Sequence, residues 1–376
     1  MSARLVINAT ILNQPRQTGL GIYTANLLPP LLRWAAEDTN FSEIVIAGTP
    51  DSLRESLGPA LDHPKTGVHE IPTVSPFRRL WHLDRLVMAE RKRAGCVVFY
   101  SPTHHGVVRG GIIQVITVHD LFARIFPHNY RRQYYYFRWY VPRILANTSR
   151  VIVDSECTGA DLRRFYTRCP AIDVVHAAVR EDLSSKTLSE VLSLRDQRFF
   201  LFLGATFPYK NCLRLIDAFA EYRKTGSARL VFVGGRDEYT DRLQRHLEQK
   251  HAGLIGDVIF VEYASVSELV WLFRHAIALM LTTLYEGFGL PALEAMACDC
   301  PVIASRAGSL PEVCDEAALF VNPTDTASIT RAMLEVERDS AIRERLIQAG
   351  QENVRRFSWD KSAEKVYRVL RSCLSP

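Results

Sequence analysis

Short apolar runs alternate with amphipathic stretches through the first half of the chain. The apolar runs predict strands at residues 4–8, 43–47, 68–71, 96–100, 112–118, 150–154 and 172–175. Between most of them, apolar residues recur at helical spacing and predict helices at residues 19–34, 77–93, 131–147 and 156–168. This alternation of strand and helix favours a doubly wound, mostly parallel sheet.

A polar stretch at residues 180–198 shows no strand pattern and reads as a linker, after which a second series begins. Its strands are predicted at 199–203, 229–233, 258–261, 277–282 and 302–305, and its helices at 211–223, 238–250, 266–275 and 291–298. The tail from about residue 325 is helical in pattern. We therefore predict an α/β protein with two Rossmann-like domains, at 1–180 and 181–357, that face a central cleft.

Composition and charge narrow the choice of environment and partner. The eight cysteines form no C-x-x-C pair, which indicates free thiols in a reducing cytosol. The first residues lack the apolar core of a signal peptide, and no apolar run reaches the ~18 residues of a spanning helix. Residues 1–178 hold 21 of the 46 basic and 14 of the 41 acidic residues, so their net charge is positive. Either this half meets an anionic partner or the imbalance is a chance feature of a solvated surface.

The sharpest chemical signal follows the predicted strand at 277–282. It reads Glu286-Gly287-Phe288-Gly289-Leu290-Pro291-Ala292-Leu293-Glu294. Glycines that lead into a helix with proline in its first turn expose backbone N–H groups, which form an anion site. Carboxylates on either side of such a loop suit the hydroxyl groups of a sugar and a ribose. The alternative is a helix whose acidic residues merely favour its dipole.

A second loop, Gly204 to Asn211, directly follows the strand at 199–203. Lys210 stands at the start of the next helix, where its charge would stabilise a departing diphosphate. Asn211 is the expected N-cap of that helix. The alternative is an ordinary surface lysine.

Two further motifs lie in the first half. His119 and Asp120 follow the strand at 112–118, where a His-Asp pair either orients a sugar hydroxyl or is structural. Gly19 and Gly21 precede the first helix, in a loop that either contacts a ligand or simply makes a tight turn. Thr24 occupies the place of the third glycine of a dinucleotide fingerprint, which argues against NAD binding.

These motifs resemble the retaining family 4 glycosyltransferases of GT-B fold, whose E-x7-E motif the chain matches letter for letter, and in particular bacterial mannosyltransferases of surface-polysaccharide synthesis. The resemblance implies that Glu286 binds the donor hexose and Glu294 the ribose. It also implies that the last helix, 358–376, returns to the first domain. It implies that sugar and phosphate contact Gly287 and the amides of Phe288, Gly289 and Leu290, and that the diphosphate binds at Gly204 and Lys210. The base is expected at Tyr263 and the donor sugar at His119. Gly19 and Gly21 are expected beside the reacting sugar and the acceptor.

The chain departs from the family at two positions around the lysine. Many members carry arginines where this chain has Ala205 and Tyr209. The diphosphate would then be neutralised by Lys210 alone, or with help from Arg236.

The resemblance further implies transfer with retention, without metal or cofactor, in which the departing phosphate takes the proton of the acceptor. GDP-mannose is the favoured donor, with UDP-sugars and deoxysugar donors open, and the acceptor is a glycan, a lipopolysaccharide intermediate or another lipid-linked molecule. The alternatives are a non-catalytic sugar-nucleotide-binding protein or a differently reacting GT-B enzyme, such as an epimerase.

Residues 130–143 are rich in both arginine and aromatic residues. Such a helix either anchors on an anionic membrane or packs its aromatics into the core. We predict a cytoplasmic protein and hypothesise peripheral contact with the inner face of the plasma membrane. Aromatic residues with arginine also suit single-stranded nucleic acid, but nothing else in the sequence supports binding of nucleic acid, and we predict none.

Overall fold

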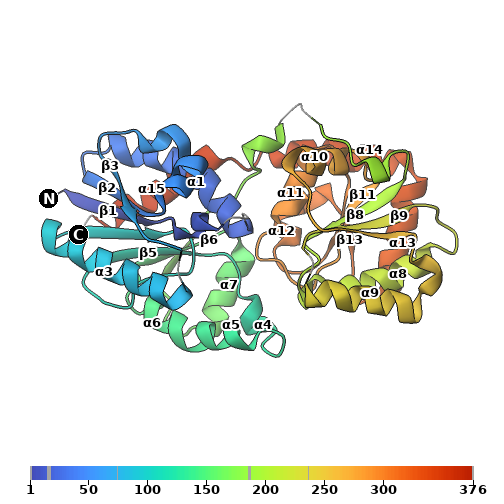
Figure 1. Ribbon diagram of the computed structural model, residues 1–376, viewed down its shortest axis with the longest axis horizontal. Helices are drawn as coiled ribbons and strands as arrows, with labels where there is room; N and C mark the ends of the chain where they lie inside the picture. The colour runs from blue at the N-terminus through green and yellow to red at the C-terminus, as the bar shows by residue number, and fades with distance from the viewer. Residues whose placement is uncertain (1, 15–17, 74, 185–187, 236, 375–376) are drawn as a thin grey trace. The chain divides into compact units, whose positions relative to one another are not determined.

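The computed structural model describes residues 2–14, 18–73, 75–184, 188–235 and 237–374 (Figure 1). They divide into two compact units. Unit 1 comprises the chain up to Ala177 together with the segment from Phe357 onward, and unit 2 comprises Ala178–Arg356. The sequence placed these boundaries at 180/181 and 357/358.

Unit 1 is built on a parallel seven-stranded sheet in the order β3-β2-β1-β4-β5-β6-β7. The strands are β1 Ala3–Asn8, β2 Phe41–Gly48, β3 Thr66–Glu70, β4 Val97–Ser101, β5 Ile113–Val118, β6 Arg150–Val153 and β7 Ala171–Val174. The helices are α1 Gly19–Glu37, α2 Pro50–Leu57, α3 Pro76–Ala94, α4 Phe122–Ile125, α5 Arg131–Tyr135, α6 Val141–Leu145, α7 Glu156–Phe165 and α15 Trp359–Ser372.

Burial explains why the strands of unit 1 read as apolar runs. Val6 and Phe99, on the paired strands β1 and β4, are fully buried and share a cluster with Val87 of α3. A parallel sheet covered by helices on both faces needs apolar residues in succession, not in alternation. All seven strands predicted for this half of the chain are present, with ends that differ by at most a few residues.

Unit 2 contains a parallel six-stranded sheet in the order β10-β9-β8-β11-β12-β13. Its strands are β8 Phe199–Leu203, β9 Arg229–Val233, β10 Val258–Val261, β11 Ala278–Leu281, β12 Val302–Ser305 and β13 Leu319–Val321. Its helices are α8 Cys212–Tyr222, α9 Glu238–Lys250, α10 Val266–His275, α11 Leu290–Ala297, α12 Leu310–Cys314, α13 Thr326–Arg338 and α14 Ser340–Val354.

The sequence missed the shortest of these elements. Strand β13 and helix α12 are too short to show a period, and α2, with its proline at the first turn, was also missed. In contrast, the predicted bounds of α9 and α10 agree with the structure, because both helices begin at capping boxes, Asp237 with Thr240 and Ser265 with Glu268.

The last helix, α15, packs on α1 within unit 1. The ring of Trp359 lies edge-on to Tyr23, with 5.4 Å between centroids. The hydroxyl of Ser362 donates to the carbonyl of His176 at 2.6 Å, and Tyr367 donates to Asp38 at 2.8 Å. These contacts make α15 part of unit 1 although it follows unit 2 in the chain.

Two negative findings apply to the described part of the chain. None of its helices combines the length and apolar character needed to cross a bilayer. All eight cysteines are free thiols.

Candidate functional site

The two loops singled out in unit 2 follow neighbouring strands. Lys210 follows β8 and Glu286 follows β11, and these strands pair through Phe200–Ala278 and Leu201–Leu279. In the strand order of this sheet, the chain reverses direction between β8 and β11. Open α/β sheets bind ligands at the carboxyl ends of strands at such a switch point.

Hydrogen bonds join the two loops. The amide of Leu284 donates to the carbonyl of Tyr209 at 2.8 Å, and the side chain of Asn211 donates to the carbonyls of Thr282 at 2.9 Å and Pro323 at 2.7 Å. Asn211 is the N-cap residue of α8, as predicted, but its side chain makes no capping hydrogen bond to the helix. Asn211 adopts a left-handed conformation (φ 64°), which asparagine tolerates better than most residues, and its amide ties the loops together instead.

This bracing brings Lys210 and Glu286 into contact. The Nζ atom of Lys210 lies 2.8 Å from Oε1 of Glu286, and their side chains are only 13% and 10% exposed. The two residues are 76 positions apart in the chain. Charges so shielded from water interact strongly, so a diphosphate that approached Lys210 would compete with the Glu286 carboxylate.

The glycine loop is held from the following strand–helix junction. Gly289 (φ 99°) is the N-cap residue of α11, whose first N–H groups have no partner within the helix. The hydroxyl of Ser309 donates to the carbonyls of Phe288 at 2.7 Å and Glu286 at 3.1 Å, and the amide of Ser309 donates to Glu286 as well. The backbone of Glu286 rests against Gly308 (φ 58°), at which an added Cβ would lie 2.5 Å from the Glu286 oxygen. The conformation of the loop is thus set by Gly308 and Ser309.

Glu294 lies in α11, which begins at Leu290, and is 6% exposed. Burial raises the pKa of its carboxyl to about 7, against the lowering effect of Arg180 and with a raising effect of Asp182. Arg180 itself forms two hydrogen bonds of 2.5 Å with Asp182. Glu294 is therefore a carboxyl group near its titration point at neutral pH.

In unit 1, His119 has acceptors at both ring nitrogens. Nδ1 lies 2.8 Å from Oδ2 of Asp154 and Nε2 lies 2.9 Å from the carbonyl of Pro102. A carbonyl oxygen only accepts, so Nε2 carries a proton. Burial lowers the pKa of His119, but the Asp154 carboxylate and the Pro102 carbonyl outweigh it and raise that pKa above its ordinary value.

The carboxylate hydrogen-bonded to His119 belongs to Asp154, which directly follows the neighbouring strand β6. Asp120, the next residue in the chain, also raises the pKa of His119 by its charge. Asp154 stands at the end of a strand that the sequence did predict. Its proximity to His119 follows from the pairing of β5 with β6, which the sequence does not state.

The loop predicted at Gly19 and Gly21 is the start of a helix in the structure. Gly19 and Gly21 lie in the first turn of α1, and an added Cβ at Gly19 would meet nothing within 4 Å. Tyr23, one turn along, packs edge-on against the His119 ring, with 4.4 Å between centroids. Through Tyr23, helix α1, whose first turn contains Gly19 and Gly21, packs against His119.

Residues 185–353, which contain Lys210, Glu286 and Glu294, match the family Glycosyl transferases group 1. Residues 185–353 thus form a group 1 glycosyltransferase domain. The chain is 29% identical to the O-antigen chain mannosyltransferase RfbU of Salmonella typhimurium over 330 residues, which are 85% of this chain and 88% of that protein. It is 32% identical to the O-antigen chain mannosyltransferase B of Escherichia coli over 166 residues, 44% of this chain and 43% of that protein.

Solved structures share the fold of this glycosyltransferase. Sucrose-phosphate synthase from Thermosynechococcus elongatus superposes with a TM-score of 0.74 at 22% identity, covering 98% of each chain. The likeness shows that the predicted class is correct, with two Rossmann-like α/β units as in GT-B enzymes.

Three other positions were predicted at the donor site of unit 2: Gly204, Tyr263 and Arg236. Gly204 (φ 74°) directly follows β8 and lies next to Gly234, and an added Cβ at Gly204 would meet nothing within 4 Å. Tyr263 follows β10, is 65% exposed and lies close enough to Arg180 to affect its pKa. Arg236, suggested as a second cation for the diphosphate, lies outside the described residues.

Arg180 is a candidate that the sequence analysis passed over. Burial lowers the pKa of its guanidinium, but Asp182 and Glu294 outweigh burial and raise that pKa above its ordinary value. It stands at the start of the polar stretch that reads as a linker, and no motif marks it. Its contact with the surroundings of Glu294 appears only in the folded unit.

The pKa of Glu294 predicts how stability changes with pH. Its pKa of about 7 in the folded state exceeds the ordinary glutamate value of 4.5, so the folded state holds the proton longer than the unfolded state as pH rises. Wild type should therefore lose about 3 kcal/mol of stability between pH 4.5 and 7, relative to Glu294→Gln. Urea unfolding across this range measures the difference, with Glu344→Gln, at an exposed glutamate, as the control. Parallel pH curves for wild type and Glu294→Gln would show that Glu294 ionises normally.

Proposed function

We propose that this protein is a retaining hexosyltransferase that moves mannose from GDP-mannose onto a glycan or lipid-linked acceptor in cell-surface polysaccharide synthesis. The observation that carries the proposal is the buried Lys210–Glu286 pair at the switch point of unit 2, beside the glycine loop that opens α11. The lysine cation suits the diphosphate, and the glutamate carboxylate suits the hydroxyl groups of the sugar. The N-terminus of the helix suits the negative charge that develops as the bond between them breaks.

The roles proposed for these residues follow from their charges. The diphosphate binds at Lys210 and at the amides of Phe288, Gly289 and Leu290, and Glu286, released from Lys210, accepts hydrogen bonds from the hexose. The bond between the anomeric carbon and the phosphate oxygen breaks, and the acceptor oxygen bonds to that carbon on the same face. The departing phosphate takes the acceptor's proton, so the reaction needs no protein base, and the resemblance implies that it needs no metal ion.

Glu294 is proposed to bind the ribose and Tyr263 the base. His119 remains a predicted contact of the donor sugar on the strength of the resemblance. In the structure both of its nitrogens are engaged by Asp154 and Pro102, so a sugar hydroxyl would have to replace the Pro102 carbonyl at Nε2.

GDP-mannose is favoured because two of the relatives are named as mannosyltransferases of O-antigen chains. UDP-sugars and deoxysugar donors are the competing choices. A non-catalytic sugar-nucleotide-binding protein or an epimerase-like enzyme is the competing function, and such a protein would bind the nucleotide without transferring the sugar.

A transfer assay separates these functions. Purified protein is incubated with GDP-mannose or with UDP-sugars and a lipid-linked oligosaccharide acceptor, and free nucleoside diphosphate and glycosylated acceptor are both measured. The proposal expects the two products in equal amounts with GDP-mannose. Release of nucleotide without transfer, epimerised donor, or no turnover with any donor would each contradict it.

We also propose that the enzyme acts in the cytoplasm and touches an anionic membrane with one face of unit 1. Tyr135 and Trp139 are 52% and 56% exposed, and Arg131, Arg132 and Arg138 are exposed around them. Phe137 points inward, at 3% exposure, so the two readings of residues 130–143 apply to opposite faces of one segment.

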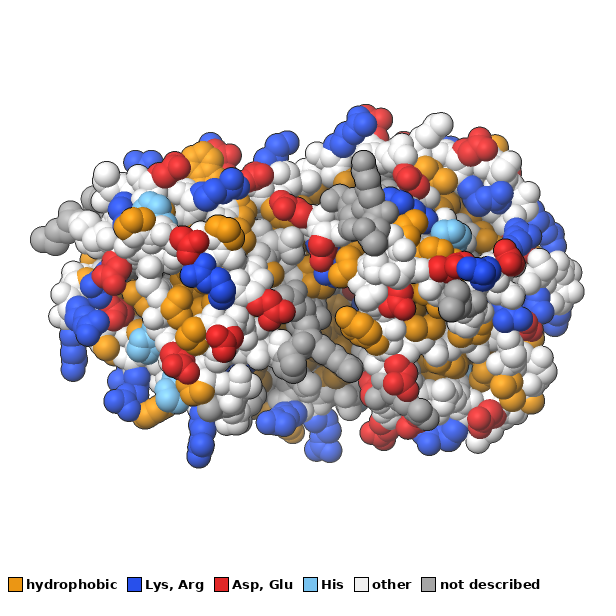
Figure 2. Space-filling view, turned by 45° about the horizontal axis from the view of Figure 1, so that its top comes forward, with side chains coloured by type: hydrophobic (Ala, Val, Ile, Leu, Met, Phe, Trp, Pro, Cys, Tyr) orange, Lys and Arg blue, Asp and Glu red, His pale blue; other side chains and the backbone are white. Residues whose placement is uncertain are grey.

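Helix α3 extends this face. Its Trp81 is 52% exposed and carries Arg85 over the ring at 4.6 Å. The pKa of Tyr140 responds to Asp84 of α3, after burial as the larger cause, so the two segments are neighbours. Figure 2 shows Lys and Arg side chains projecting along the lower edge of unit 1. Exposed tryptophan with arginine suits the interface of an anionic bilayer.

The membrane proposal predicts a charge-dependent loss of binding. Replacing Arg131, Arg132 and Arg138 by glutamine should weaken binding to phosphatidylglycerol vesicles roughly 100-fold, at about 1 kcal/mol for each arginine. Vesicle flotation measures the partition. The control replaces Arg242, Arg245 and Arg331 of unit 2, which removes the same net charge. Equal loss in both triple variants, or no binding by wild type, would contradict a specific face.

A further inference from the structure

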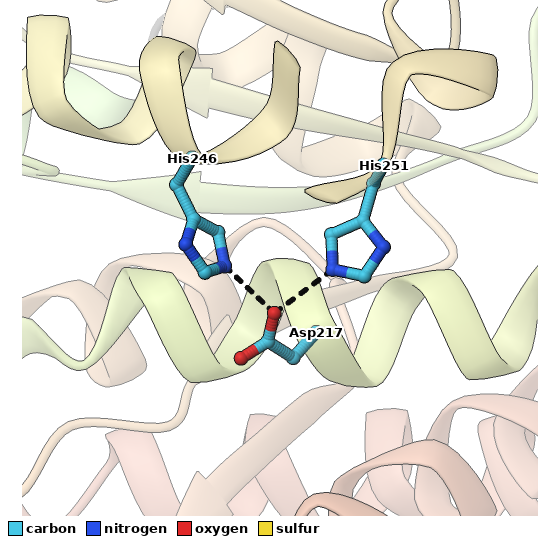
Figure 3. A group of neighbouring side chains, drawn as sticks. All are labelled: Asp217, His246 and His251. Atoms are coloured by element: carbon cyan, nitrogen blue, oxygen red, sulfur yellow. Dashed lines mark hydrogen bonds and ion pairs between the residues drawn. The ribbon is translucent and has the colours of Figure 1, made fainter. Parts of the chain in front are cut away.

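Three side chains of unit 2 converge on one point away from the loops described above. Asp217 lies on α8, His246 lies on α9, and His251 directly follows α9. Figure 3 shows both imidazoles pointing at the Asp217 carboxylate from the helix opposite. The Nε2 atoms of His246 and His251 lie 2.7 Å and 2.9 Å from the same oxygen, Oδ1.

The end of α9 makes this convergence feasible. Two residues five apart on a continuous helix point about 140° away from each other. α9 ends at Lys250, however, and His251 leaves the helical conformation (φ −138°, ψ 42°). That turn returns the His251 side chain toward α8, on the side that His246 already faces.

The ligand set is that of a transition-metal site. Within the described part of the chain, these residues form a group whose potential ligand atoms all lie within 4.8 Å of one another. Two imidazole nitrogens and one carboxylate oxygen are common ligands of Zn²⁺, with bonds of about 2.0–2.2 Å. In a tetrahedral site such ligands lie about 3.3 Å apart, so the two measured separations need to open by only about half an ångström.

Burial is compatible with entry of an ion. The side chains of His246, His251 and Asp217 are 14%, 22% and 38% exposed. The site is therefore open to solvent on one side, which leaves room for a water molecule as fourth ligand, while the helices hold the three side chains in place.

We propose that Asp217, His246 and His251 form a zinc site that cross-links α8 to the end of α9 and stabilises unit 2. The site goes beyond the proposed sugar transfer, in which it takes no part. Asp217 is more than one helical turn beyond Asn211, and an ion here would act on the stability of α8 and not on the donor.

Binding of Zn²⁺ to the full chain, purified without a histidine tag and stripped of metal, tests the site. Calorimetry should show one equivalent bound at this site, and the melting temperature should rise with Zn²⁺ concentration by mass action. Co²⁺ provides a second measurement, because a site of nitrogen and oxygen ligands gives visible d–d bands without the charge-transfer band of a thiolate. A thiolate band would place the ion on the cysteines and overturn the proposal.

The decisive variant is Asp217→Asn, which keeps an oxygen to accept hydrogen bonds from both imidazoles but removes the charge that a metal needs. Asp217→Asn, His246→Gln and His251→Gln should each weaken Zn²⁺ binding by more than about 10-fold. His69→Gln, at an exposed histidine of β3, should leave it unchanged. If Asp217→Asn binds Zn²⁺ as wild type does, or if wild type binds none, the three residues are joined by hydrogen bonds alone.

Discussion

Replacing Lys210 by alanine should lower kcat of sugar transfer roughly 100- to 1,000-fold, the usual effect of removing one group that stabilises developing charge. The negative charge on the diphosphate grows as the sugar–oxygen bond breaks, so the missing cation is felt most in the transition state. The two arginines that many family members carry near this lysine are replaced by Ala205 and Tyr209, which are 0% and 9% exposed and carry no charge. The loss should therefore be at the upper end of that range.

Two variants separate this effect from damage to the fold. Lys210→Ala leaves the Glu286 carboxylate buried without its 2.8 Å partner, so its melting temperature is measured alongside its activity. Lys210→Ala/Glu286→Gln removes that unpaired charge and should regain stability without regaining activity. Lys224→Ala, at a lysine whose side chain is 68% exposed on the same unit, should leave kcat within about twofold of wild type. A Lys210→Ala enzyme with full kcat would show that the diphosphate departs without this cation.

Gly308→Ala should disable the enzyme although residue 308 is not expected to touch the donor. The new Cβ would lie 2.5 Å from the carbonyl oxygen and 2.6 Å from the nitrogen of Glu286, and the backbone there has φ 58°. The Glu286 backbone must move, and a shift of about 1 Å in a reacting group can lower activity 100-fold. The strain should also lower stability by about 1–3 kcal/mol.

The matched control for that variant is Gly256→Ala. An added Cβ at Gly256 meets nothing within 4 Å, and its φ is not positive. The transfer assay and urea unfolding are run on both variants. Gly308→Ala that retains wild-type activity would show that the position of the Glu286 backbone is not critical for transfer.

Much of the fold was predictable because parallel strands buried on both faces leave continuous apolar runs. β8, β9, β10 and β12 have the predicted bounds. β13 and α12 were missed since three to five residues cannot display a period. The order of the strands in the sheet could not be predicted from the sequence. The contact between Lys210 and Glu286 depends on that order, because β8 and β11 are adjacent only in the folded sheet.

The residues of the candidate site likewise fall into those that the sequence predicted and those that it did not. Glycines, lysine and glutamates appear in motifs because a loop of fixed shape needs them at fixed spacing. The residues that support them do not: Asp154 and Arg180 act through interactions between distant segments, and nothing in the local sequence marks them. Asn211 is the N-cap residue of α8, as predicted, but the bonds of its side chain to Thr282 and Pro323 could not be read from the local sequence.

Thermal unfolding with GDP, UDP, ADP, dTDP and their sugars shows whether unit 2 binds a sugar nucleotide through Glu294, Glu286 and Lys210. A ligand at ~100 times its Kd adds ~2.7 kcal/mol to the stability of the state that binds it. We predict that guanine nucleotides raise the melting temperature of wild type and not that of Glu294→Ala. If no nucleotide raises it, or if the same nucleotide raises it equally in Glu294→Ala, the assignment of the donor site is contradicted.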